Sequence, residues 1–365
     1  MRDEAKCARV LLEEYGVTLI WFDSLGAKSS SIYHISGIIV DPGAAAMQPS
    51  YPLPHEEKER LRREAIRRIE EFAYKANVII ITHYHYDHYA RPWDPDVIDP
   101  AKMYLDGKII IAKNPNYYIN ESQWKRSREF IESLARLAGL EAASIYEEPK
   151  NIDIHDPLDN LPYALSKDFG DYSRRRIELL EKGKKWFNKL SRLWHSSRWV
   201  KNRLKIGSST IILGDRGFYE TGGVRIRLLG SWFHGVEYDR TGWVTPVLIE
   251  WMNKKILYTS DLMGPIIEDY AYKIIEEKPD IIIADGPPTY LYPYMLNRIN
   301  LKRAIENMEL IVLSNPDLVI YDHHLLREKK WRERIAPLLE TARRHGVPLL
   351  TAAECMGRKP LIDRL

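Results

Sequence analysis

The sequence has few cysteines, little net charge and no long apolar run, and each shortage excludes a class of protein. Two cysteines in 365 residues exclude a disulfide framework or a thiolate metal site, and they favour a reducing, cytoplasmic setting. Lys and Arg outnumber Asp and Glu by only 54 to 51, so the chain as a whole is no polyelectrolyte. No apolar run approaches the roughly 20 residues of a membrane span, so no membrane partner is expected.

The remaining composition is typical of a folded globular protein. Hydrophobic residues make up 45% and charged residues 29% of the chain, which is long enough for one large domain with an insertion. Glutamine occurs only twice, whereas Lys, Arg and Glu are plentiful. We interpret this bias as that of a thermophile.

Strand and helix patterns alternate along the chain. Strands are predicted over residues 17–22, 32–40, 78–82, 108–112, 208–213, 224–229, 244–251, 254–261, 279–286 and 318–324. Helices are predicted over 1–16, 56–76, 121–138, 298–310 and 328–345. This alternation predicts two sheets flanked by helices, an α/β sandwich.

Residues 141–205 differ in character from the rest. Eight acids against two lysines fill 141–171, whereas twelve Lys or Arg against two Glu fill 173–205. Because strand patterns return only afterwards, we interpret 141–205 as a helical insertion that separates the two halves of one domain, 1–140 and 206–365.

Aromatic and basic residues alternate within 173–205. A packing stripe at helical spacing is formed by Trp186, Leu190, Leu193 and Trp194. Basic residues interleaved with Trp also suit a nucleic-acid backbone. The acidic segment is able to neutralise much of this charge, so packing within the chain or a homo-oligomer is the favoured role, with nucleic acid as the alternative partner.

The strongest chemical signal is THYHYDHYA, residues 82–90. Three of the chain's 11 histidines lie in this loop, directly after a predicted buried strand. Imidazole nitrogens and carboxylate oxygens suit Zn²⁺, with Fe and Mn as alternatives. Residues two apart point the same way, so His83 and His85 are predicted to share one ion, whereas Asp87 and His88 reach a second.

These residues resemble the HxHxDH signature of the metallo-β-lactamase superfamily. Its other elements follow in order, as IIVDPG with Asp41, SWFHG with His234, ILYTSD with Asp261, and VIYDHH with His323 and His324. Four further segments resemble sequences of an uncharacterised archaeal branch of predicted metal-dependent hydrolases: FDSLGAKSSS, INESQWKRS, ADGPPTYL and YDHHLLRE.

The resemblance implies a four-layer αββα sandwich with two divalent metal ions. It places His83, His85 and His234 on the first ion, Asp87, His88 and one C-terminal histidine on the second, and Asp261 between them. Strand alternation sends His323 and His324 to opposite sides, and His323 is slightly favoured as the ligand.

Two further aspartates are expected to support the ligands. Asp41 is expected to orient the histidine loop through backbone hydrogen bonds rather than bind metal. Asp322 either fixes the tautomer of a neighbouring ring or caps a helix at the surface.

A dinuclear site in this setting, with zinc as the favoured metal, predicts hydrolysis. Two ions about 3.5–4 Å apart lower the pKa of a shared water toward about 7, which yields a bridging hydroxide for attack on an ester, lactone, thioester or phosphodiester. Asp87 and Asp261 are the candidate catalytic carboxylates. Related di-iron oxygen reductases carry Glu where His85 stands, which argues against redox chemistry.

Alternatives remain open for the function. One is an RNA- or DNA-processing nuclease with 173–205 as substrate arm, and another is a non-catalytic, metal-stabilised binding protein. A small-molecule substrate is the favoured partner. Its pocket is expected to include Ser24 and, after a later strand, Asp285, Thr289 and Tyr290.

Overall fold

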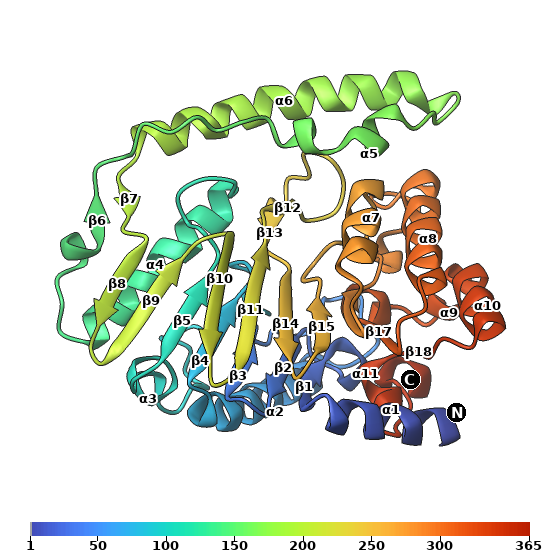
Figure 1. The fold of residues 1–365 in the computed structure, drawn as a ribbon, viewed down its shortest axis with the longest axis horizontal. Helices are drawn as coiled ribbons and strands as arrows, with labels where there is room; N and C mark the ends of the chain where they lie inside the picture. The colour runs from blue at the N-terminus through green and yellow to red at the C-terminus, as the bar shows by residue number, and fades with distance from the viewer. Residues whose placement is uncertain (1) are drawn as a thin grey trace.

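The computed structural model describes residues 2–365 and contains two seven-stranded sheets (Figure 1). The first, in the order β1-β2-β3-β4-β5-β9-β8, consists of Val17–Phe22, Ser30–His34, Ile38–Val40, Val78–Ile81, Ile109–Ala112, Ser209–Leu213 and Arg203–Ile206. The second, in the order β10-β11-β14-β15-β16-β17-β18, consists of Arg216–Thr221, Val224–Leu229, Val247–Trp251, Lys254–Tyr258, Ile281–Asp285, Leu318–Asp322 and Leu349–Leu350. A separate short pair joins β12 (Trp232–Phe233) to β13 (Trp243–Val244).

Side-chain alternation explains why the central strands are buried on both faces. Along β4, Val78 and Ile80 belong to one apolar core that also contains Ile283 and Ile320 of the second sheet. The intervening Ile79 and Ile81 belong to the other core, with the helices. Since successive side chains point to opposite faces, β-branched runs without polar residues are what such strands require.

Helices cover the outer faces of the sandwich. The N-terminal half carries α1 (Arg2–Glu14), α2 (His55–Lys75), α3 (Pro100–Leu105) and α4 (Glu121–Leu137). The C-terminal half carries α7 (Glu268–Glu277), α8 (Arg298–Leu313), α9 (Trp331–Arg334), α10 (Ala336–His345) and α11 (Ala352–Cys355). The predicted α/β class, with a four-layer arrangement of two sheets between helices, is confirmed.

Residues 141–205 lie across one end of the sandwich. They contain β6 (Tyr146–Glu147), α5 (Pro162–Ser166), the long helix α6 (Tyr172–Ser196), β7 (Trp199–Val200) and β8, and α6 runs along the top of Figure 1. The expectation that strands return only after residue 205 is wrong, because β8 pairs with β9 as the edge of the first sheet. The division into 1–140, 141–205 and 206–365 stays a prediction.

Three predicted elements are in fact divided. The expected strand 32–40 is the hairpin β2–β3, which turns at Gly37 with a φ of 84°. The expected strand 244–251 is split between β13 and β14, with Pro246 in the gap. The expected helix 328–345 is split between α9 and α10 by Pro337, which occupies the first turn of α10, where it is tolerated.

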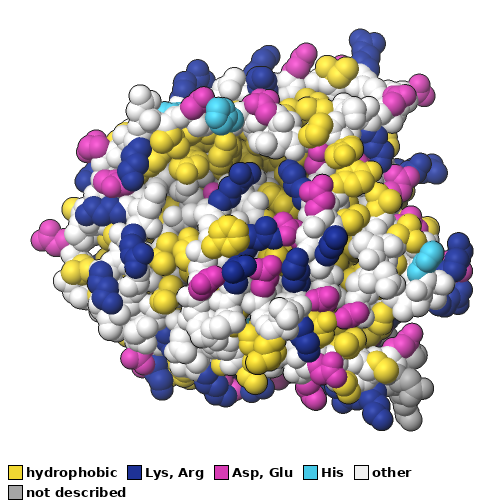
Figure 2. Space-filling view, in the orientation of Figure 1, with side chains coloured by type: hydrophobic (Ala, Val, Ile, Leu, Met, Phe, Trp, Pro, Cys, Tyr) yellow, Lys and Arg dark blue, Asp and Glu magenta, His cyan; other side chains and the backbone are white. Residues whose placement is uncertain are grey.

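The surface carries charges of both signs. Figure 2 shows basic and acidic side chains interspersed over one face of the molecule, as the small net charge of +3 leads one to expect. Among residues 2–365, no helix is long and apolar enough to cross a membrane.

The parallel strands at the centre of each sheet place their carboxyl ends at one edge of the sandwich. In the first sheet β3 and β4 run parallel, and in the second β15, β16 and β17 do so. Asp41, the 82–90 loop, Asp261, Asp285 and the 323–324 pair all follow these strands. Loops after parallel strands meet at this edge, which brings the candidate residues together.

Candidate metal centre

The histidine loop begins directly after β4 and is seated on the segment after β3. A Cβ atom on Gly43 would lie 2.1 Å from the Tyr89 backbone nitrogen, so only glycine permits this approach. Within the loop, His83 Nε2 lies 3.1 Å from His85 Nδ1, and the His88 amide donates to the His85 carbonyl at 3.0 Å. This turn brings the His88 ring beside the His83 ring, with centroids 4.0 Å apart, on the side that faces His323, whose centroid is 5.1 Å from that of His88.

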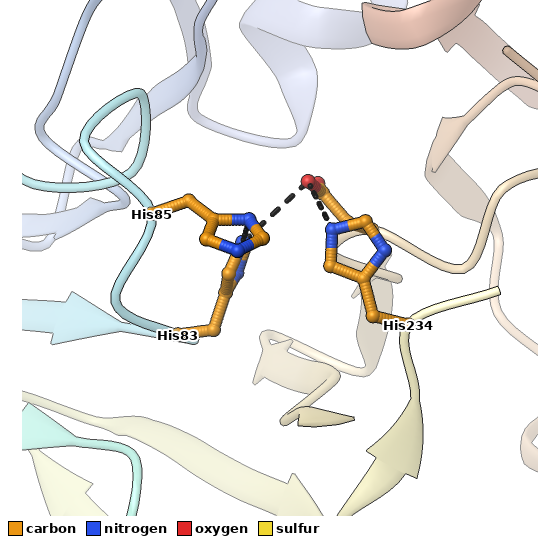
Figure 3. Close-up of side chains that lie close together, drawn as sticks. His83, His85 and His234 are labelled. Carbon is orange, nitrogen blue, oxygen red and sulfur yellow. Dashed lines mark hydrogen bonds and ion pairs between the residues drawn. The ribbon is translucent and has the colours of Figure 1, made fainter. Parts of the chain in front are cut away.

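Side chains from distant segments converge on one carboxylate oxygen. Asp261 Oδ2 lies 3.5 Å from His83 Nε2 and 3.1 Å from His88 Nε2. The same oxygen is 3.3 Å from His234 Nε2 and 3.4 Å from His323 Nε2. Figure 3 shows His83 and His85 on one side and His234 on the other, with rings turned toward a common point.

Several of these buried polar atoms lack hydrogen bonds. Within residues 2–365, the atoms without a partner include His88 Nε2, both nitrogens of His234, both carboxylate oxygens of Asp261, and His323 Nε2. Buried polar groups in folded proteins are nearly always paired, because an unpaired one costs free energy. Nitrogen and carboxylate donors left unpaired around one point are what divalent cations require.

The donors fall into groups, each able to surround one ion. His83, His85, His234 and Asp261 form one group whose ligand atoms lie within 4.8 Å of one another. Asp87, His88 and His323 form a second, and Asp261, His323 and His324 form a third. The structure therefore brings together every residue that the sequence analysis assigned to metal, with Asp261 between the groups.

The two C-terminal histidines lie on the same side, so the expectation of opposite sides is wrong. Strand β17 ends at Asp322, and His323 adopts a left-handed conformation with a φ of 40°. This breaks the strand alternation and leaves the two ring centroids 4.4 Å apart. His323 directs Nε2 toward Asp261, whereas His324 Nδ1 contacts Asp285 Oδ1 at 2.9 Å.

Asp41 contacts the His88 ring on the side opposite Asp261. Its carboxylate accepts from the Thr82 amide at 2.8 Å and from the Thr82 hydroxyl at 2.6 Å. It also lies 2.8 Å from His88 Nδ1 and accepts from the Tyr258 hydroxyl at 2.9 Å. These contacts orient His88 so that its Nε2 faces Asp261.

Two roles were predicted as alternatives for Asp322, namely to cap a helix or to hold a neighbouring ring. Asp322 has the first role, and Asp23 has the second. Asp322 caps the short helix 323–327 by accepting from the His323 amide, but it is fully buried and not at the surface as expected. It also accepts from the amides of Ser24 and Ala352, and not from a ring. Asp23 Oδ1 instead lies 3.0 Å from His323 Nδ1. Sequence analysis missed Asp23, although its place at the end of the first strand, in FDSLG, was the available signal.

Electrostatics give the carboxyl and imidazole groups unequal proton affinities. Burial alone would lower the pKa of His88, but Asp261 and Asp41 raise it to about 10. Burial, together with the charge of Asp261, raises the pKa of Asp285 to about 8. Burial lowers the pKa of His324, whose Nδ1 lies 2.9 Å from Asp285 Oδ1.

The expected pocket residues occupy different environments. Ser24 is buried, and its hydroxyl accepts from the Ala353 amide, so it is committed to the fold. Thr289 is also buried, and its hydroxyl is unpaired in the described structure. Tyr290 is half-buried, with its hydroxyl 3.4 Å from Arg327 Nη1, and Asp285 holds His324. Of these four residues, only Tyr290 is partly exposed.

The loop that carries His234 is held by the insertion and by α4. The Tyr238 hydroxyl donates to Asp156 at 2.6 Å, and Gln123 Nε2 donates to the Thr241 carbonyl at 2.7 Å. Gly183 of α6 lets the Tyr238 ring approach, since a Cβ there would lie 2.4 Å from it. Residues 141–205 thus pack directly behind one of the candidate ligands.

Comparison with solved structures gives a distant similarity. The metallo-β-lactamase fold protein YhfI from Bacillus subtilis aligns with a TM-score of 0.41 at 13% identity, which covers 92% of this chain and 95% of that protein. No protein-family model matches the sequence.

Sequence comparison gives relatives over almost the whole chain. A UPF0282 protein from Methanocaldococcus jannaschii is 29% identical over 347 residues, which covers 93% of this chain and 91% of the relative. A UPF0282 protein from Metallosphaera sedula is also 29% identical over 347 residues, covering 94% and 88%. The predicted similarity to an archaeal branch of proteins is confirmed, because this chain is similar over almost its whole length to these archaeal UPF0282 proteins.

Proposed function

We propose that this protein is a metal-dependent hydrolase with a dinuclear centre. The observation that carries the proposal is Asp261 Oδ2, which lies within 3.5 Å of four imidazole nitrogens and makes no hydrogen bond among the described residues. His83, His85 and His234 would hold one ion, and Asp87, His88 and His323 the other. Asp261 would contact both.

The donor set indicates the kind of metal. All the proposed ligands supply imidazole nitrogen or carboxylate oxygen, and neither cysteine belongs to the groups. Such donors suit Zn²⁺, with Fe and Mn as alternatives. We propose zinc as the resident metal.

Bound divalent ions would supply an activated water for attack on an ester, lactone, thioester or phosphodiester. Among the chain's own groups, Asp87 is placed to accept or orient a proton, because its side chain is 14% exposed, whereas Asp261 is 2% exposed. His324, held by Asp285, faces the same groups and is placed to donate a hydrogen bond to the substrate. Asp41 and Asp23 keep the rings of His88 and His323 in position.

Metal analysis of the purified protein, combined with His234→Ala, tests the proposal. We expect about two ions per chain in the unaltered protein, one or fewer in the variant, and turnover of an activated ester or phosphodiester only in the former. His155→Ala removes an exposed histidine of the insertion and serves as the matched control. Fewer than one ion per chain after reconstitution would contradict the proposal.

A loaded protein that hydrolyses none of these substrates would favour the non-catalytic alternative. The nuclease alternative is not favoured by the insertion, because Trp186 and Trp194 are buried and unavailable for base stacking. Trp186 instead stacks on Trp243, with ring centroids 5.6 Å apart. Several basic residues pair with acids, among them Lys184 with Asp156 at 3.4 Å and Lys189 with Glu121 at 2.8 Å.

A further inference from the structure

Two cations stand beside the candidate metal ligand Asp87 and have no part in holding the metals. Arg327 follows the 323–324 pair, and Lys28 lies in the loop after β1. Asp87, like His85, is a partly exposed candidate ligand. Their contacts show which of their donors remain available.

The guanidinium of Arg327 is held in place, but not all of its N–H donors form hydrogen bonds. Its Nε donates to Asp23 Oδ2 at 2.5 Å, and its Nη1 lies 3.4 Å from the Tyr290 hydroxyl. Its Nη2 lies 3.7 Å from Asp87 Oδ2, beyond hydrogen-bond distance, and makes no hydrogen bond in the described structure. The residue is only 5% exposed, so this leaves a buried, oriented donor without an acceptor.

Lys28 is held by its backbone and free at its ammonium. Its amide and carbonyl form a bridge to Ala45 at 2.9 Å each. Over residues 2–365 the half-buried ammonium makes no hydrogen bond or ion pair, whereas Lys58 nearby donates to two backbone carbonyls. The next residue of the chain lies at the metal centre, because the Ser29 amide donates to Asp23 Oδ1 at 3.0 Å and the Ser29 carbonyl lies 3.2 Å from His323 Nδ1. Lys28 is therefore adjacent in the chain to a residue that contacts both Asp23 and His323.

The charges around Arg327 and Lys28 do not balance once metal is bound. Asp23 is committed to Arg327 and His323, and Asp87 would be neutralised by the ion it holds. The Lys28 ammonium and Arg327 Nη2 then remain as donors without an acceptor in the described structure, although Arg327 keeps its ion pair with Asp23. Donors of this kind, partly or wholly buried beside a metal centre, are suited to an anionic group.

We propose that Lys28 and Arg327, with Tyr290, bind an oxyanion carried by the substrate, a phosphoryl or carboxylate group, next to the metal centre. The inference rests on the proposed hydrolase function and narrows its substrates to anionic ones. Guanidinium and ammonium groups recognise both oxyanions through charge-assisted hydrogen bonds. Neutral esters would be hydrolysed without help from this pair.

Calorimetric titration of the metal-loaded protein with inorganic phosphate, and separately with succinate, tests the inference. We expect Lys28→Gln to weaken binding of at least one of these anions about tenfold or more, without changing the metal content. Lys28→Arg should restore most of the affinity. Lys125→Gln, at an exposed lysine of α4, should leave it unchanged.

The two anions separate the two sources of the oxyanion. Loss of phosphate affinity alone assigns a phosphoryl group, and loss of succinate affinity alone assigns a carboxylate. Equal affinities in Lys28→Gln and the unaltered protein for both anions would overturn the inference. With substrates, the variant should raise KM for an anionic ester and leave kcat/KM for a neutral ester unchanged.

Failure of the hydrolase proposal would be recognised separately. If the protein binds no metal or turns over nothing, the same titration on chelator-treated protein still compares Lys28→Gln with Lys125→Gln. Dependence of anion binding on Lys28 there would retain the anion site and reject only the metal chemistry. Binding that ignores Lys28 there would reject the anion site as well.

Discussion

Two clusters of buried charge lie close together in this protein, and they differ in how completely their atoms are paired. In the first, the metal centre, Asp261 lies among four imidazoles with both carboxylate oxygens unpaired in the described structure. In the second, Glu237 of the His234 loop meets Arg303 of α8 and Arg176 of α6.

The second cluster satisfies its own charges. Arg303 donates to Glu237 at 2.7 Å and 3.2 Å and to Glu268 at 3.0 Å and 2.7 Å. Arg176 adds a bond to Glu237 at 2.8 Å. Lys167 also lies 3.0 Å from Glu268. Both carboxylates of this cluster are therefore paired with cations, although Arg176 Nε makes no hydrogen bond in the described structure.

This comparison distinguishes buried charges that stabilise the fold from buried charges that are available to bind a ligand. A closed network of ion pairs holds elements in place, whereas an open set of donors indicates a missing ligand. The two clusters are also connected, because Glu237 lies three residues after His234. The closed cluster therefore positions a ligand of the open one.

The largest expected effect comes from Asp261→Asn. An amide cannot replace the shared carboxylate, so we expect the metal content to fall to one ion or fewer per chain and kcat/KM to fall by at least about a thousandfold. Metal analysis and steady-state kinetics measure both. A variant that keeps two ions and full activity would place the centre elsewhere.

The next largest effect is expected when the ion pairs of the second cluster are broken. Glu237→Ala leaves Arg303 and Arg176 without their shared partner, and breaking such a buried pair costs about 3–5 kcal/mol of unfolding free energy. Urea denaturation measures it, with Glu220→Ala on the exposed edge strand β10 as the control. Loss of the His234-side ion in the same variant would show that the clusters are coupled, and an unchanged unfolding free energy would contradict the closed-network interpretation.

A change behind the metal centre should have a smaller effect. Asp41→Asn keeps the shape but weakens the support of His88 Nδ1, so we expect metal affinity to fall about 10- to 100-fold. Competition with a chelator of known affinity measures this fall. Retention of the unaltered affinity would mean that Thr82 and Tyr258 position the loop without Asp41.

Acid should affect the closed cluster through Glu237. Burial alone would raise the pKa of this carboxyl, but Arg303 and Arg176 lower it to about 2 from an ordinary 4.5. A depressed pKa contributes stability that is complete above about 4.5 and is lost as the pH falls toward 2. Glu237→Gln should therefore show a shallower loss of stability between pH 4.5 and 2 than the unaltered protein, as measured by thermal unfolding. Parallel curves would assign the acid sensitivity to other groups.

The smallest effect is expected from exposed ion pairs on α6. Arg175 pairs with Glu178 at 2.8 Å, and both side chains are about half exposed. Such pairs contribute little to stability, so Arg175→Gln should leave the melting temperature unchanged within error. A clear decrease in melting temperature would mean that this ion pair stabilises the attachment of α6 to the rest of the protein.

Sequence patterns were sufficient to predict much of the fold and the ligand set. The apolar run before His83 predicts a strand buried on both faces, and the spacing of Leu61, Ala65, Ile69 and Phe72 predicts the helix α2. The first three of these residues are buried, whereas Phe72 is partly exposed. Alternation of strands and helices along the chain then predicts the layers. The residues His234, Asp261 and His323 were assigned from the resemblance to the metallo-β-lactamase pattern, and not from local periodicity.

Other features depended on contacts between segments far apart in the chain. The shared side of His323 and His324 follows from one left-handed residue at the end of β17, which no periodicity reveals. Asp23 reaches His323 from 300 positions away, and Arg176 reaches Glu237 from the insertion.

The amino-acid sequence by itself determined which elements form and which donors stand at their ends, because periodicity and local backbone chemistry act over a few residues. Only the tertiary structure decided which donors share one point, which charges are closed by partners, and which, like Lys28, remain open. Those outcomes depend on distances across the sandwich between residues whose positions in the chain are unrelated.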